Sequence, residues 1–169
     1  KNLRFLTGIE QEMNLLWRGS RDGFDAKTFH TLCDGKGKTL TLIKSTSGYI
    51  FGGYTERPWS SSGWHTTEKN DNEAFIFTLT NPSGMPIKMM SNSTGKNVYY
   101  DPACGPSFGE DIRVSDNSYS NASSYCKPGN SYYAPNNKIN LEGAKFIHGG
   151  CMGENNSSFQ TLEIEVFLV

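Results

Sequence analysis

The sequence predicts a mainly β (α+β) fold, in which two antiparallel sheets form a β-sandwich flanked by short helices. Apolar and polar residues alternate along several short segments, as is typical of strands, and Gly, Asn and Pro clusters separate these segments. Both faces of the strands expected in residues 39–54 are apolar, so a single sheet would leave one face uncovered. At 169 residues the chain is long enough to bury such a core.

We expect residues 1–169 to form one domain, because no repeat, linker or change of composition divides the chain. The sequence does not begin with Met, and no apolar leader follows Lys1. We therefore expect the domain to be excised from, or processed out of, a larger chain.

Two short helices are expected before the first strand. Residues 7–10 form a capping-box pattern, and apolar residues follow at helical spacing within residues 9–16, which predicts a helix of about ten residues. The polar residues and glycine at 21–23 end this helix. Asp25 is expected to cap a second helix over residues 26–33.

Residues 39–44 and 49–54 are expected to form a hairpin, because the apolar period changes there to two. The Ser-Gly pair at 47–48 supplies the turn. Gly52 and Gly53 predict a bulge or a close backbone approach on the second strand.

The strands expected next are residues 74–80 and 87–90, joined by the turn signal at 81–84. Short strands at 98–100 and 112–114 would flank a loop containing residues 104–106.

Two polar regions are expected to be irregular: residues 56–72, a long surface loop, and residues 116–140. The last strand is expected at residues 162–168, where Leu162 and the other even-numbered residues form an apolar face opposite Glu163 and Glu165.

Composition excludes two classes of partner. The net charge is −1, from 16 Lys and Arg against 17 Asp and Glu, and no basic block marks a nucleic-acid interface. The longest apolar run is far shorter than the roughly 20 residues of a membrane span. We expect a soluble protein without membrane insertion.

The four cysteines (Cys33, Cys104, Cys126 and Cys151) form no CxxC pair and are not at zinc-ligand spacing with the histidines. Free thiols are favoured. Cys104 and Cys126 lie in expected loops, so they are the candidates for a disulfide or for redox reactivity.

Seven segments, in order, resemble the TLDc domain family (oxidation-resistance and TBC-LysM-associated domain) across nearly the whole chain. They are LWRGSRDGF at 16–24, FH at 29–30, TLTLIK at 39–44, FGGY with PW at 51–59, FIFTL at 75–79, GPSFG with DI at 105–112 and LEIEVF at 162–167.

This resemblance implies a two-sheet β-sandwich in a eukaryotic, cytoplasmic protein linked to oxidative-stress response and regulation of the vacuolar proton-pumping ATPase. The family has no agreed reaction, so we expect no cofactor and, on balance, no enzymatic activity. The chain departs from the family pattern at residues 68–73 and 109–111, in loops where partner contacts are expected.

Glu56 is the first candidate for partner binding, with Arg57, Trp59 and Trp64 beside it in the same expected loop. The carboxylate of Glu56 could bind a basic group of a partner or act in acid–base chemistry. The structural alternative is a loop carboxylate that accepts backbone hydrogen bonds or pairs with a nearby arginine.

Three further groups of residues are expected to have structural roles. Arg18, Arg21 and Asp22 are expected to fix the corner after the first helix through charge-assisted hydrogen bonds. His30 is expected to be a packed or capping imidazole. A set of acidic residues could collect a hard cation, although it lacks EF-hand spacing, and we expect a solvated loop without metal there: Glu68, Asp71 and Glu73.

Three functions remain open at this point. The first is a non-catalytic TLDc module that binds a protein. The second is a secreted or surface β-sandwich that uses its loops for Ca²⁺ or glycan contact. The third is a weak thiol-based antioxidant enzyme.

Overall fold

A computed structural model describes residues 2–62, 67–82, 84–92, 96–133 and 158–169. The helices are α1 (Asn2–Thr7), α2 (Gly19–Asp22) and α3 (Ala26–Cys33). The strands are β1 (Asn14–Arg18), β2 (Thr39–Ser45), β3 (Ile50–Thr55), β4 (Thr67–Lys69), β5 (Phe75–Thr80), β6 (Ile87–Ser91), β7 (Val98–Tyr100), β8 (Cys104–Phe108), β9 (Ile112–Ser115), β10 (Ser124–Cys126), β11 (Tyr132–Tyr133), β12 (Ser158–Phe159) and β13 (Thr161–Leu168). None of the described helices is long and apolar enough to cross a membrane.

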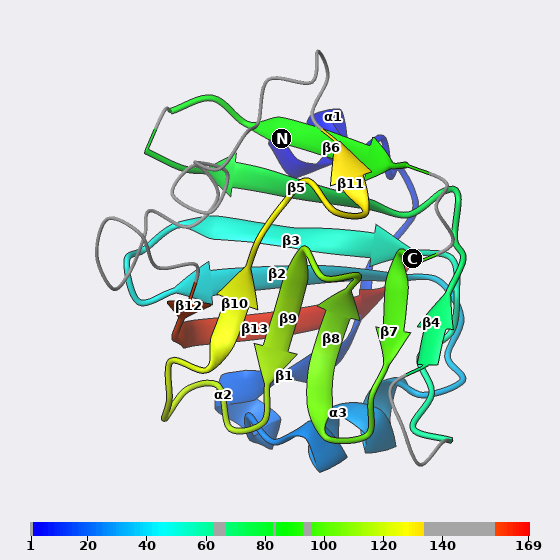
Figure 1. Ribbon diagram of the computed structural model, residues 1–169, viewed down its shortest axis with the longest axis vertical. Coiled ribbons are helices and arrows are strands. Elements are labelled where there is room, and N and C mark those ends of the chain that lie inside the picture. The colour runs from blue at the N-terminus through cyan, green and yellow to red at the C-terminus, as the bar shows by residue number, and fades with distance from the viewer. Residues whose placement is uncertain (1, 63–66, 83, 93–95, 134–157) are drawn as a thin grey trace.

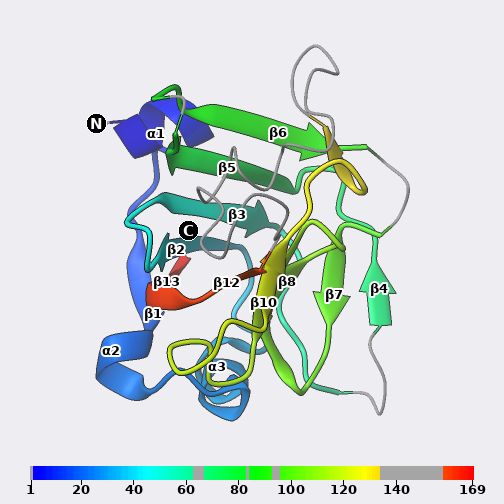
Figure 2. The same cartoon turned by 60° about the vertical axis from the view of Figure 1, so that its left-hand side comes forward.

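Two antiparallel sheets face each other, which confirms the predicted sandwich. The larger sheet has the order β1-β13-β2-β3-β5-β6-β11, and the smaller has the order β12-β10-β9-β8. Their strands cross steeply in Figure 1, and Figure 2 shows the two sheets as separate layers. A two-stranded ribbon of β4 and β7 lies beside β8.

The predicted hairpin of residues 39–54 is confirmed as β2 and β3, which lie near the middle of the larger sheet. A Cβ atom on Gly52 would lie 1.9 Å from the carbonyl oxygen of Thr41, and one on Gly53 would lie 2.7 Å from the ring of Phe108. The two glycines therefore allow the close approach that the sequence predicts.

The inner faces of the two sheets enclose the main core. Phe51 and Ile76 from the larger sheet are fully buried with Phe108 and Ile112 from the smaller sheet. Aromatic rings make edge contacts across this layer, including Phe51 with Phe159 at 5.1 Å between centroids.

The outer face of the larger sheet is apolar as well. One row of residues paired from strand to strand crosses all seven strands on this face: Leu15, Phe167, Leu40, Tyr54, Phe75, Met90 and Tyr133. The segment before β1 covers the middle of the row with Leu3, Leu6 and Ile9. Figure 2 shows α1 on this outer side, away from the smaller sheet.

The helix predicted from Thr7 onward is wrong, because α1 ends at Thr7 instead of starting there. Gly8 has a left-handed backbone (φ +75°), and its N–H donates to the carbonyl of Arg4 at 2.8 Å, which closes the helix. The apolar spacing of residues 9–16 serves another purpose. Ile9 packs over the sheet, while Leu16 lies in the edge strand β1 beside β13.

The second predicted helix is confirmed as α3. The carboxylate of Asp25 accepts from the N–H of Thr28 at 2.8 Å, and the carboxylate of Asp116, from the β9–β10 loop, accepts from the N–H of Ala26 at 2.7 Å. Two carboxylates thus cap this helix, one local and one distant in the sequence. The helix ends at Cys33, and Asp34 is its C-cap, before the left-handed Gly35.

Three regions expected to be irregular contain strands. Residues 56–72, expected to be one long surface loop, include β4, which pairs with β7. Residues 104–106 belong to β8, whose pairing with β9 shifts register between Cys104 and Ser107. This irregularity accommodates Pro106, which has no N–H to donate to a ladder. Residues 116–140 include β10 and β11, and positions 134–140 lie outside the described residues.

The last strand, β13, is confirmed, but its first apolar residue is misassigned. The pairing with β2 shifts register between Thr161 and Glu163, so Leu162 leaves the alternation and is 43% exposed. Ile164 and Val166 are fully buried as predicted.

Two buried threonines on one face of β2 give a test of this packing. Thr39 accepts a hydrogen bond from the indole N–H of Trp59 at 2.8 Å, whereas among the described residues the hydroxyl of Thr41 has no partner. We expect Thr41→Val to raise the free energy of unfolding by about 1 kcal/mol, because it removes a buried unpaired hydroxyl. Thr39→Val should lower it by about 1–3 kcal/mol, because the indole N–H loses its acceptor. Urea denaturation measures both, and a destabilised Thr41→Val would contradict this description.

Candidate functional site

Glu56 lies just after β3, at the start of a segment that we call the Glu56 loop (residues 55–62). Its carboxylate pairs with Lys38 and accepts a hydrogen bond from the hydroxyl of Tyr54 at 3.2 Å. The Lys38 ammonium holds the pKa of Glu56 below its usual range. About a third of the side chain (36%) is exposed, so this oriented carboxylate is available to a binding partner.

Asp71, which is buried, fixes the backbone at the start of this loop. One carboxylate oxygen accepts from the N–H of Glu56 at 2.7 Å, the hydroxyl of Thr55 at 2.6 Å and the N–H of Arg57 at 3.3 Å. The other oxygen accepts from the N–H of Glu73 at 3.1 Å. One oxygen of Asp71 therefore fixes the start of the Glu56 loop, and the other fixes the backbone at Glu73.

The acidic cluster does not assemble as a metal site in the described part of the chain. No group of three or more His, Cys, Asp or Glu side chains there is placed to hold an ion. Glu73 is exposed, and Glu68 lies in β4 with a side chain outside the described set.

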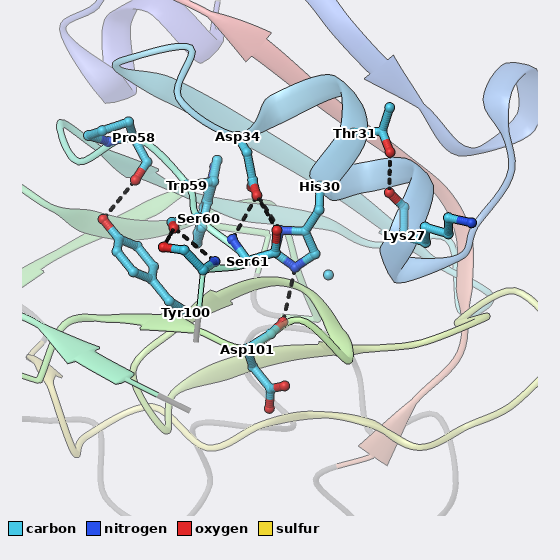
Figure 3. A network of polar contacts seen from close by, with 12 residues as sticks. Lys27, His30, Thr31, Asp34, Pro58, Trp59, Ser60, Ser61, Tyr100 and Asp101 are labelled. Atoms are coloured by element: carbon cyan, nitrogen blue, oxygen red, sulfur yellow. Dashed lines mark hydrogen bonds and ion pairs between the residues drawn. The ribbon is translucent and has the colours of Figure 1, made fainter. Parts of the chain in front are cut away.

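The far end of the Glu56 loop is anchored by other elements. The carbonyl of Pro58 accepts from the hydroxyl of Tyr100 at 2.7 Å, and the carbonyl of Trp59 accepts from the N–H of Gly35 at 3.0 Å. Ser61 donates through its N–H and its hydroxyl to one oxygen of Asp34, each at 2.7 Å. Figure 3 shows the contact of Pro58 with Tyr100 of β7 and the contact of Ser61 with Asp34, which follows α3. The loop is held on both sides of Glu56.

The other partner-binding candidates differ in how far their side chains are exposed. Arg57 is exposed, and its Nε donates to the carbonyl of Asn70 at 3.0 Å. Trp59 is only 1% exposed and packs against Phe29 and Phe108, so it presents no surface to a partner. Trp64 lies outside the described residues.

His30, Asp34 and Ser61 have the residue types of a hydrolase triad but not its connectivity. In such a triad the serine hydroxyl bonds to the histidine ring and the carboxylate lies behind the ring. Here Ser61 bonds to Asp34, and Nε2 of His30 faces the carbonyls of Asp101 and Cys104 at 3.0 and 3.1 Å. His30 therefore cannot take a proton from Ser61 in this arrangement.

The residues expected at the corner are brought together. Asp22 accepts from the N–H of Arg18 at 2.9 Å and pairs with Arg21 at 2.8 Å, which lowers the pKa of Asp22. Arg18 also pairs with Glu165 of β13 at 2.6 Å. These bonds join α2, β1 and β13.

The described cysteines are buried free thiols, so the bridge considered between Cys104 and Cys126 is not formed. Burial raises the pKa of both thiols, although Arg113, whose Nε lies 3.3 Å from the sulfur of Cys104, acts in the opposite direction there. Burial also raises the pKa of Cys33 to about 12. A raised pKa disfavours the reactive thiolate. Cys151 lies outside the described residues.

Sequence reasoning missed a second buried carboxylate, Asp111. It accepts from the N–H groups of Gly129, Asn130, Ser131 and Tyr132 at 2.7–3.3 Å. Asn97 connects it to the Glu56 loop, because its side chain accepts from the N–H of Asp71 at 3.3 Å and its carbonyl accepts from the hydroxyl of Tyr132. Nothing local in the sequence marks these roles, since every partner is distant along the chain.

The burial of Asp111 predicts that the stability of the domain depends on pH. Burial raises its pKa to about 6, against the opposing effect of the backbone N–H groups. An aspartate in the unfolded chain titrates near pH 4, so the folded protein holds this proton over a wider range. The contribution of this group to the free energy of unfolding is complete below about pH 4. It falls by about 3 kcal/mol as the pH rises to about 6. We expect Asp111→Asn to lose this part of the pH dependence, measured by urea denaturation at pH 4.5 and 7. Equal pH dependence in both proteins would contradict the assignment.

Comparison with known proteins agrees with this architecture. A family model described as the TLDc domain matches residues 3–169. The MTOR-associated protein MEAK7 of Danio rerio is 31% identical over 68 residues, which are 40% of this chain and only 13% of that protein. Because the family model matches nearly every residue, the chain belongs to the TLDc domain family.

Proposed function

We propose that this TLDc domain is a non-catalytic protein-binding module and that the Glu56 loop makes its principal contact. The observation that carries the proposal is a partly exposed carboxylate, that of Glu56, on a loop anchored on both sides. Lys38 and Tyr54 orient Glu56, and Asp71 fixes the backbone beneath it. A preordered loop loses little conformational freedom on association, so more of its contact energy contributes to affinity.

The partner is expected to present a basic side chain to Glu56. A carboxylate held in place favours a charge-assisted hydrogen bond, and arginine can make two such bonds at once. The resemblance to the family supports a subunit of the vacuolar proton-pumping ATPase as this partner, in pump regulation or oxidative-stress response. The name of MEAK7 supports an MTOR-containing assembly as a second candidate.

The bonding of His30 and Ser61 supports a binding role over hydrolysis. The ring nitrogen that a hydrolase would use as a base is occupied by two main-chain carbonyls. The raised pKa values of Cys104 and Cys126 argue in the same direction against a thiol-based antioxidant activity.

Replacing the carboxylate of Glu56 tests the proposal. We expect Glu56→Gln to reduce the affinity for the purified peripheral part of the vacuolar proton-pumping ATPase by about ten-fold or more, because the partner's cation loses its counter-charge. Calorimetry or a quantitative pull-down measures the change. Glu12→Gln is the matched control, since Glu12 is an exposed carboxylate in the segment between α1 and β1.

The control separates a specific contact from a change of net charge. Equal losses in Glu56→Gln and Glu12→Gln would indicate long-range electrostatics and contradict the proposed contact. Unchanged binding in Glu56→Gln would exclude Glu56 from the interface.

A further inference from the structure

His30 forms a buried polar junction that the proposed contact does not use. Its ring lies where the C-terminal end of α3 meets the Glu56 loop and the turn before β8, as Figure 3 shows. Three segments distant in the sequence thus meet at one imidazole.

Each ring nitrogen of His30 faces acceptors. Nδ1 lies 2.8 Å from a carboxylate oxygen of Asp34, and Nε2 lies 3.0 Å from the carbonyl of Asp101 and 3.1 Å from that of Cys104. A neutral imidazole has one N–H, whereas the imidazolium has two. The geometry is therefore satisfied by the doubly protonated ring.

The charged groups around the ring single out Asp34 as its counter-ion. The Asp101 carboxylate is paired with Arg113, and that guanidinium also donates to the sulfur of Cys104. Asp34 is left to face the ring with one oxygen while its other oxygen holds Ser61 of the Glu56 loop.

We propose that His30 is a protonation-dependent latch that fixes the far end of the Glu56 loop to α3. This regulation rests on the proposed function, because the loop it controls is the proposed contact. With the ring doubly protonated, the chain His30–Asp34–Ser61 is closed. Acidic conditions favour this closed form.

Loss of a proton opens the latch whichever nitrogen releases it. If Nδ1 loses its proton, a lone pair faces the Asp34 carboxylate. If Nε2 loses it, a lone pair faces two carbonyls, and the rigid ring relieves this only by turning, which also moves Nδ1 away from Asp34. Asp34 then loses its fixed position, and Ser61 loses a fixed acceptor. The start of the loop stays in place, because Asp71 holds Glu56 and Arg57 independently.

Amide hydrogen exchange and ring NMR test the latch without a partner. We expect ¹⁵N spectra to show His30 doubly protonated at low pH. The protection factor of the Ser61 amide, corrected for the intrinsic pH dependence of exchange, should fall at least ten-fold as the ring loses its proton. The Glu56 amide, held by Asp71, should keep its protection over the same range.

Two variants control the measurement. His30→Gln should abolish the pH step at Ser61, and a step of undiminished size in the folded variant would overturn the latch. Thr31→Ala is the matched control on α3, because the Thr31 hydroxyl donates to the carbonyl of Lys27 and faces away from the loop. It should leave the step intact.

The wild-type titration is decisive even if His30→Gln does not fold. Ser61 protection that stays constant while the His30 ring titrates would overturn the latch, as would a ring that carries a single proton at every pH at which the domain is folded. Either result leaves the Glu56→Gln binding test unaffected, so the two proposals fail separately.

Discussion

The structure depends on the larger sheet being apolar on both faces. A sheet of this kind is stable only when two separate layers exclude water from it. The smaller sheet covers the inner face, and the segment containing α1 covers the middle of the outer face with Leu3, Leu6 and Ile9. The glycines at 52 and 53 meet the same demand, because they let backbone and rings approach more closely than a Cβ atom permits.

The features that follow from local pattern were predictable from the sequence. Period-two alternation identified β2, β3, β5 and β13, and a side-chain cap identified α3. The N-terminal helix was misplaced because the spacing of apolar residues in 9–16 fits a helix equally well, and only the conformation of Gly8 decides where the helix ends. β8 was missed because its Gly and Pro read as a loop, whereas pairing with β9 makes the segment a strand.

The candidate site could be predicted only in part from the sequence, for a related reason. Position after a strand drew attention to Glu56, but its partners Lys38 and Asp71 come from other loops. Asp71 and Asp111 each use a buried carboxylate to gather backbone N–H groups, and Asn97 links the two. Such long-range bonds carry no periodic signal, and a buried carboxylate that organises loops has the same local sequence as a solvated one.

The position of β13 between β1 and β2 has a consequence for how the chain folds. Among the described strands β13 comes last along the chain, and it fills the gap between β1 and β2, which come first, so this ladder cannot close before residue 168 has left the ribosome. Contacts of such long range slow the search for the native state. Until residue 168 emerges, β2 carries an exposed apolar edge, and the nascent chain passes through an aggregation-prone interval in which a chaperone would be of most use.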